Sequence, residues 1–172
     1  MKKRITSIVI LLLAFTLQSQ TKKETYSKDN YSIEYPTDWK FDNSGFRGTS
    51  FTITSPASSE EDAFSENVNM IIQDLSAYNF DLDQYVSLSK NQFITGIPGS
   101  KFIKDERSKN AAYEYHTFVV EADIKNMSLK MKQIYFIKNK HAYILTFTSL
   151  KSEYDNYVKT ADEILNSFKL TK

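Results

Sequence analysis

The C-terminal half of the chain contains three long segments in which apolar and polar residues alternate, and these segments limit the possible folds more than any other feature. They span Ala112–Ala122, Met127–Lys138 and His141–Ser149. Alternation with a period of two is typical of strands that bury one face. The connections near 123–126 and at Asn139–Lys140 are short enough for hairpins, so we expect the three strands to form an antiparallel meander.

The last segment of the chain predicts a helix that covers this sheet. The helix is expected from about Glu153 to Leu170, with Ser152 as its N-terminal cap. A helix of this kind is marginal in water on its own, so its apolar stripe needs a sheet to pack against. The residues of the stripe are Tyr154, Tyr157, Val158, Ala161, Ile164, Leu165 and Phe168.

Shorter strands and one further helix precede the meander. The helix is predicted after Asp81, which can cap it together with Gln84, and Gly96 and Pro98 mark its end. The polar stretch 57–66 is expected to be a surface loop. The predicted strands lie at Tyr31–Tyr35, Phe51–Thr54, Asn67–Leu75 and Phe102–Glu106.

The first twenty residues have the pattern of a secretory signal. Basic residues at 2–4 precede an apolar run from Ile8 to Ala14. This run is shorter than the roughly 20 residues that a membrane-spanning helix needs. We therefore expect a signal peptide at 1–20, cleaved after Ser19 or Gln20, and a protein that is periplasmic or secreted.

The remainder of the chain is expected to form a polar leader at 21–30 and a single domain at 31–170. No later stretch is apolar enough to predict a transmembrane segment after signal removal. Loss of the three basic residues of the signal changes the formal net charge from +1 to −2. This balance predicts no general affinity for nucleic acid.

A series of motifs runs through nearly all of the expected mature chain. It begins with YSIEYPTDW, continues with NVNMIIQDL and DLDQYVSLSKNQF, and ends with HAYILTFTS and ADEILNSFK. In this order of motifs the chain resembles the PsbP/Mog1-like superfamily, and in particular exported bacterial proteins with a PsbP C-terminal-like domain. The resemblance implies an α+β fold, an α/β/α sandwich with a central antiparallel sheet. Members of the superfamily include a photosystem II extrinsic subunit and a nuclear-transport factor, so the resemblance implies a fold and not a role.

The first motif contains the single tryptophan of the chain. We expect the strand at its start to enter the central sheet and Pro36 to end that strand, where no backbone donor is needed. Trp39 should then fold back onto the core or the rim of the sheet.

The composition argues against several kinds of enzyme. The chain has no cysteine, which excludes a thiol nucleophile and a cysteine-ligated metal centre. Its four glycines form neither a phosphate-binding loop nor a dinucleotide-binding motif. The only two histidines, His116 and His141, are expected to lie too far apart to share a metal or a proton. We therefore expect a non-enzymatic protein with no catalytic residues and no cofactor.

Acidic residues gather in one part of the chain. The span 60–83 contains seven aspartates and glutamates and no lysine or arginine. It is either a solvated acidic surface or a site for a small ligand or a divalent cation, because carboxylates are the ligands that a hard cation prefers. The candidate metal ligands are Asp74, Asp81 and Asp83.

The aromatic residues provide the other functional candidates. Trp39, Tyr113 and Tyr115 belong either to the core or to a surface that binds a partner, where tyrosine is enriched. The main hypothesis is therefore an exported module that binds an unidentified protein or another envelope component. The alternative hypothesis is a small-ligand or cation-binding protein that uses the acidic span.

Overall fold

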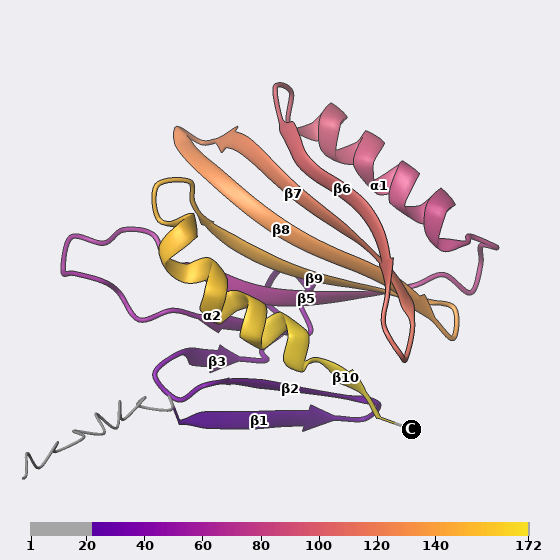
Figure 1. The fold of residues 1–172 in the computed structure, drawn as a ribbon, viewed down its shortest axis with the longest axis horizontal. Helices are drawn as coiled ribbons and strands as arrows, with labels where there is room; N and C mark the ends of the chain where they lie inside the picture. The colour runs from indigo at the N-terminus through magenta and orange to yellow at the C-terminus, as the bar shows by residue number, and fades with distance from the viewer. Residues whose placement is uncertain (1–21, 172) are drawn as a thin grey trace, which may run out of the picture.

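A computed structural model describes residues 22–171, so the expected signal peptide at 1–20 lies outside the described residues. The chain forms an α/β/α sandwich of the α+β class, in which a seven-stranded antiparallel sheet has one helix on each face (Figure 1). Both the fold class and the central antiparallel sheet are as predicted. In sheet order the strands are β3 (Lys40–Asp42), β4 (Phe51–Thr54), β5 (Asn67–Asp74), β9 (His141–Leu150), β8 (Met127–Lys138), β7 (Glu114–Ile124) and β6 (Lys101–Lys109).

A second, three-stranded sheet lies beside the first, and the sequence did not predict it. Its order is β1 (Lys23–Lys28), β2 (Tyr31–Pro36) and β10 (Lys169–Leu170). The predicted first strand is thus β2, but the expectation that it enters the central sheet was wrong. The polar leader expected at 21–30 was also wrong over Lys23–Lys28, which pairs with all of β2. This edge strand is mostly exposed and is held by backbone pairing, so it lacks an apolar pattern that would reveal it.

The predicted meander is present, and two tight turns set its register. The turns at Lys125–Asn126 and Asn139–Lys140 each place two successive residues at positive φ. Such turns match the twist of the strands that they join. The first turn lies at Lys125–Asn126, so β7 extends to Ile124 and His116 pairs with Tyr135 of β8.

Each helix covers a different face of the central sheet. The helix α1 (Leu82–Gly96) packs over β7 and β8, and α2 (Tyr154–Ser167) packs over β5, β9 and β2. The predicted capping box of α1 is present: Gln84 donates its backbone N–H to Asp81 at 2.8 Å, and its side chain accepts from the Asp81 N–H at 3.1 Å. The predicted cap of α2 was wrong, because Glu153 occupies that position. The helix also ends before residue 168, and β10 follows it.

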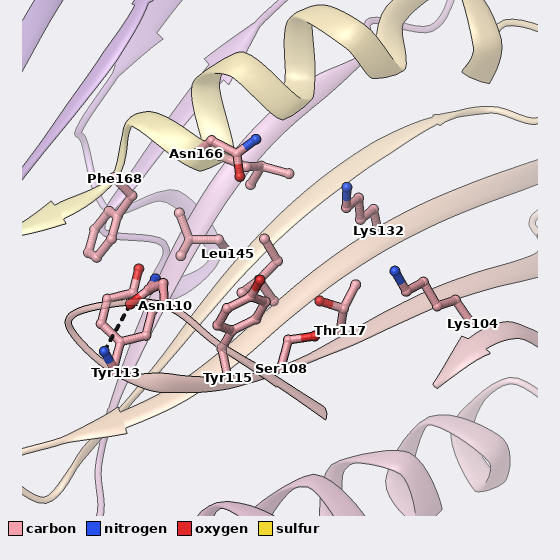
Figure 2. A pocket seen from close by; sticks show the side chains of 12 residues that line it. Lys104, Ser108, Asn110, Tyr113, Tyr115, Thr117, Lys132, Leu145, Asn166 and Phe168 are labelled. Carbon is pink, nitrogen blue, oxygen red and sulfur yellow. Dashed lines mark hydrogen bonds between the residues drawn. The ribbon is translucent and has the colours of Figure 1, made fainter. Parts of the chain in front are cut away.

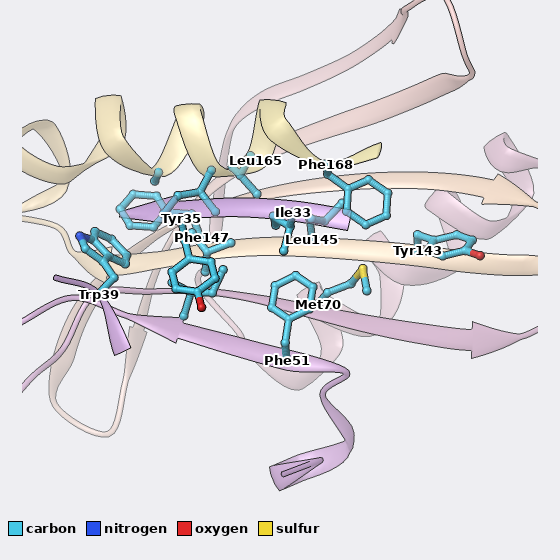
Figure 3. Packing of buried hydrophobic residues seen from close by; sticks show 14 of the residues in the cluster. Ile33, Tyr35, Trp39, Phe51, Met70, Tyr143, Leu145, Phe147, Leu165 and Phe168 are labelled. Carbon is cyan, nitrogen blue, oxygen red and sulfur yellow. The ribbon is translucent and has the colours of Figure 1, made fainter. Parts of the chain in front are cut away.

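The larger of the two hydrophobic clusters lies between the central sheet, α2 and β2 (Figure 3). Phe136 and Tyr143 stack in parallel at 4.8 Å between ring centroids, and Phe168 lies 5.6 Å from Phe136. Trp39 meets the ring of Tyr157 edge-on at 6.3 Å and is only 6% exposed. Trp39 therefore belongs to the core. The second cluster lies under α1.

Deletion of the Trp39 side chain should strongly destabilise the fold. We expect Trp39→Ala to lower the free energy of unfolding by about 3–5 kcal/mol, because it removes a large buried aromatic ring. The measurement is chemical denaturation followed by circular dichroism. Phe46→Ala is the matched control, because the Phe46 ring is 65% exposed. A loss below about 1 kcal/mol for Trp39→Ala would contradict its burial.

The docking of α2 can be tested in the same way. Leu165 is 4% exposed, so Leu165→Asp buries a carboxylate without a partner and should cost several kcal/mol, about 3 or more. Lys159 is exposed on the other side of the helix, and Lys159→Asp should change stability by less than about 0.5 kcal/mol. Equal melting temperatures for the two variants would show that α2 is not part of the core.

Candidate functional site

The surface between α2 and the β6–β7 side of the sheet forms a groove of about 320 Å³ (Figure 2). It exists because α2 lies over β5 and β9, while β7 and β6 continue past the helix. Its lining combines aromatic and apolar side chains with hydroxyl, amide and lysine side chains. The groove is lined by Lys104, Ser108, Asn110, Tyr113, Tyr115, Thr117, Lys132, Ile134, Leu145, Leu165, Asn166 and Phe168.

Two of the residues singled out in the sequence, Tyr113 and Tyr115, meet in this groove. Tyr113 stacks on Phe136 at 4.1 Å, and its ring meets Tyr115 edge-on at 6.3 Å. The side chain of Asn110 fixes the preceding turn, because its Oδ1 accepts from the N–H of Ala112 at 2.8 Å and of Tyr113 at 2.9 Å. Burial raises the pKa of the Tyr113 hydroxyl. Both tyrosines are half-buried, so they support the core and also present surface to the groove.

The two lysines at the rim are each paired with a carboxylate. Lys132 donates to Asp162 of α2 at 2.6 Å, and Lys104 lies 2.7 Å from Glu106. The first pair joins β8 to α2 along the groove. Since each positive charge has a negative neighbour, the groove offers hydrogen-bonding groups and aromatic surface more than net charge.

A groove that contains aromatic side chains and little net charge is suited to binding a ligand. Pockets of this kind bind through apolar and aromatic walls, and a few polar groups fix the orientation of the ligand. Tyrosine suits such a wall because its ring is large and rigid and its hydroxyl is polar. The groove can therefore take an apolar side chain of a partner between Tyr115 and Leu165, with the hydroxyl and amide groups available to its backbone.

The two histidines lie elsewhere. His116 is buried on the α1 face of the sheet, where its Nε2 lies 2.6 Å from the Asp105 carboxylate. Lys90 of α1 bonds the same carboxylate, so the three side chains join α1 to β6 and β7. The hydrogen bond from Lys90, supported by that from His116, holds the pKa of Asp105 below its usual range against an opposing effect of burial. His141 is at the start of β9, and its Nδ1 lies 2.8 Å from the Asn139 carbonyl oxygen.

The three candidate metal ligands do not come together. The Ser76 hydroxyl donates to Asp74, as does the Ser76 N–H at 2.7 Å, and these two hydrogen bonds lower the pKa of Asp74. Asp81 caps α1, and Asp83 forms an ion pair with Arg107. Within residues 22–171, no group of three or more histidines and carboxylates is arranged to hold a metal ion.

Sequence reasoning found the tyrosines of the groove but not the rest of it. The groove residues on the sheet could have been predicted, because Tyr115 and Thr117 share one face of β7. The groove residues on α2 could not, because Leu165 and Asn166 line the groove only once the helix is docked on the sheet. Trp39, the third aromatic candidate, lies outside the groove, beside a shallow polar depression that includes Asp38.

No protein-family model matches the sequence. A search of the curated proteins likewise finds no match. The solved structures do give matches. One is cyanobacterial PsbP (CyanoP) from Synechocystis sp. PCC 6803, with a TM-score of 0.64 at 14% identity, covering 92% of this chain and 98% of that chain. The chain has the PsbP-like fold.

Two further structures match this PsbP-like fold. LpqN of Mycobacterium tuberculosis, described as involved in cell envelope biogenesis, has a TM-score of 0.63 at 11% identity, and 88% of this chain and 91% of that chain are covered. PA94 of Pseudomonas aeruginosa, a protein of unknown function, has a TM-score of 0.61 at 14% identity, with 84% and 94% covered. The resemblance stated from the sequence motifs is therefore confirmed at the level of the fold. Among the described residues, neither helix is long and apolar enough to cross a membrane.

The Asp105 pair predicts how acid affects stability. The pKa of Asp105 is lower in the folded than in the unfolded chain, so the ionised carboxylate stabilises the fold above about pH 4. This stabilisation is lost as the pH falls through the pKa of Asp105 in the folded chain. We expect the free energy of unfolding of Asp105→Asn to be about 1 kcal/mol lower than that of the wild type at pH 7, a small difference because the pair is partly exposed. Below about pH 4 this difference between the two proteins should narrow.

The measurement is urea denaturation at several pH values between about 3 and 7. Asp38→Asn serves as a control, since Asp38 is exposed and has no side-chain hydrogen-bond partner among the described residues. A gap that stays constant over this pH range would show that the Asp105 carboxylate does not stabilise the fold.

Proposed function

We propose that this chain is an exported, non-enzymatic PsbP-like domain that acts as a protein-binding or assembly module of the cell envelope. The observation that carries the proposal is the groove between α2 and β6–β8, whose tyrosines are half-buried and accessible from its mouth. The signal pattern at 1–20 supports export to the periplasm or beyond. The similarity to LpqN, described as involved in cell envelope biogenesis, supports the envelope as the place of action.

The expected partner is a segment of another protein that inserts an apolar side chain into the groove. Tyr113, Tyr115 and Leu165 provide the wall for that side chain. Ser108, Asn110 and Asn166 form part of the rim, where hydroxyl and amide groups can bond the backbone of the segment. Such a combination of aromatic anchors and a polar rim is typical of protein interfaces. The cation-binding alternative lacks comparable support, because its three aspartates are occupied by separate partners.

The proposal predicts that closing the groove abolishes capture of a specific partner. Ser108→Arg places a long charged side chain at the mouth of the groove, and Tyr115→Ala removes part of its floor. Each change should reduce partner recovery about tenfold or more, the effect expected when a central interface contact is lost. The measurement is affinity capture from envelope extracts with the chain from Thr21 to Lys172, quantified by mass spectrometry.

Ser87→Arg is the matched control, because it introduces the same side chain at an exposed position of α1. The partner must be retained by the wild type and by this control and lost by both groove variants, with melting temperatures unchanged in Ser108→Arg. Equal recovery by Ser108→Arg and Ser87→Arg would show that the groove is not the binding site.

A further inference from the structure

The groove between α2 and the β6–β7 side of the sheet is richer in hydrogen-bond donors than in acceptors. Lys104 and Lys132 each carry an ammonium group with three donors and no acceptor. Their ion pairs, with Glu106 and Asp162 respectively, each occupy one of these donors and leave two. Neither carboxylate lines the groove, whose lining contains two positive side chains and no negative one.

The amide and hydroxyl groups at the other end of the groove do not offset this excess of donors. The Oδ1 of Asn110 already accepts from two backbone N–H groups, so the Nδ2 of the same amide is left as a donor. Burial raises the pKa of the Tyr113 hydroxyl, which therefore keeps its proton and can donate it. The groove thus complements a group that accepts several hydrogen bonds.

Thr117 is the most deeply buried hydroxyl residue of the groove. It is 5% exposed, yet its hydroxyl makes no hydrogen bond within residues 22–171. Its neighbours in the sheet are Ile134, which has no polar side-chain group, and Glu106, which is paired with Lys104. A buried hydroxyl without a partner is costly, so a ligand that accepts a hydrogen bond from Thr117 gains stability.

The register of the sheet places the lysines and the tyrosines at different ends of the groove. Lys104 and Lys132 lie in one row, with Val119 of β7 between them. Thr117 is two residues before Val119 on the same strand, and Tyr115 is four residues before it. Side chains two residues apart on one face of a strand are separated by about 7 Å. Figure 2 shows the same order, with the two lysines at one end of the groove and aromatic side chains toward the other.

We propose that the groove binds the free C-terminus of a protein partner whose last residue is apolar. This inference rests on the binding function proposed for the groove and specifies which part of the partner enters it. The terminal carboxylate lies at the lysine end, where it accepts from the two ammonium groups and the Thr117 hydroxyl. The apolar side chain of the same residue lies between Tyr115 and Leu165.

The size and the chemistry of the groove favour a chain end over an internal segment. Its volume of about 320 Å³ is close to the lower limit of about 300 Å³ for small-ligand pockets, so it holds one residue. In a C-terminal residue the carboxylate and the side chain leave the same Cα, which matches donors that lie beside an apolar wall. An internal apolar residue would leave the donors unpaired, and an internal aspartate or glutamate would leave the wall uncovered.

The experiment is a set of paired peptides, printed through their N-termini and probed with the chain from Thr21 to Lys172. The two members of a pair have the same sequence with an apolar last residue, and they differ only in ending as a free carboxylate or as an amide. We expect retention on the carboxylate forms to exceed that on the amide forms by about tenfold or more. Equal retention on the two forms, or no retention on any peptide, would overturn the proposal.

A competition experiment separates a chain end from other carboxylates. N-acetyl-leucine carries the amide, the apolar side chain and the carboxylate of a chain end, whereas acetate has only the carboxylate and decanoate has only a carboxylate and an apolar chain. We expect N-acetyl-leucine to displace bound peptides at concentrations at which acetate and decanoate do not. Displacement by decanoate without displacement by N-acetyl-leucine would indicate a fatty-acid site and contradict the proposal.

Thr117→Val tests the buried hydroxyl directly. It keeps the shape of the side chain and should reduce retention of the carboxylate forms about tenfold, because it removes one donor to a charged group. Thr148→Val is the matched control, since Thr148 lies on the opposite face of the sheet. The melting temperature of Thr117→Val should not fall, because the hydroxyl has no partner within the described chain. Equal retention by Thr117→Val and Thr148→Val would show that this hydroxyl does not hold the carboxylate.

Lys132→Met tests the ammonium group at the same end of the groove. It preserves most of the length of the side chain, removes the charge, and should lower the preference for carboxylate over amide forms about tenfold. Lys159→Met is the matched control, because Lys159 is exposed and does not line the groove. A preference that is unchanged in Lys132→Met would contradict the proposal.

Tyr115→Ala separates this inference from the function proposed for the groove. It removes part of the wall for the apolar side chain and should weaken retention of carboxylate and amide forms alike. If the wild type retained both forms equally and Tyr115→Ala lost both, the groove would bind proteins but would not recognise a C-terminal carboxylate. If Tyr115→Ala retained all peptides as the wild type does, the groove would not be the binding site and both proposals would be wrong.

Discussion

The burial of β9 on both faces is the constraint on which the rest of the structure depends. The strand lies between β5 and β8 in the sheet and has covered side chains over most of its length. Tyr143, Leu145 and Phe147 belong to the cluster under α2, while Ala142 and Ile144 belong to the cluster under α1. A strand buried on both faces needs a layer on each side. The α/β/α arrangement follows from that requirement.

The parts of the fold that were predictable have local physical signals. The capping box of α1 is satisfied within four residues, and the hairpin at Asn139–Lys140 is a turn between two long alternating segments. The missed elements lack such signals. In β3 the only apolar residue is Phe41, and β10 has two residues that form a strand only because β2 is beside them. Their structure depends on tertiary contacts.

The candidate sites show the same division between local and tertiary information. Tyr113 and Tyr115 could be found because they share one face of a predicted strand. The groove itself could not, because it needs the docked position of α2 relative to β7. The three candidate metal ligands, which the structure does not bring together, illustrate the same division. Asp81 and Asp83 are close in sequence, but one caps a helix and the other pairs with Arg107, so proximity along the chain did not produce a shared site.

The contacts that close the second sheet join the two ends of the described chain. The Ser167 hydroxyl accepts a hydrogen bond from the Glu34 N–H, and these residues are 133 positions apart. Contacts between segments this far apart in the sequence cost entropy of loop closure. Because the chain is synthesised from its N-terminus, β2 is made long before β10, its partner in the sheet. A growing chain therefore cannot complete this second sheet until Lys169 and Leu170 have been added.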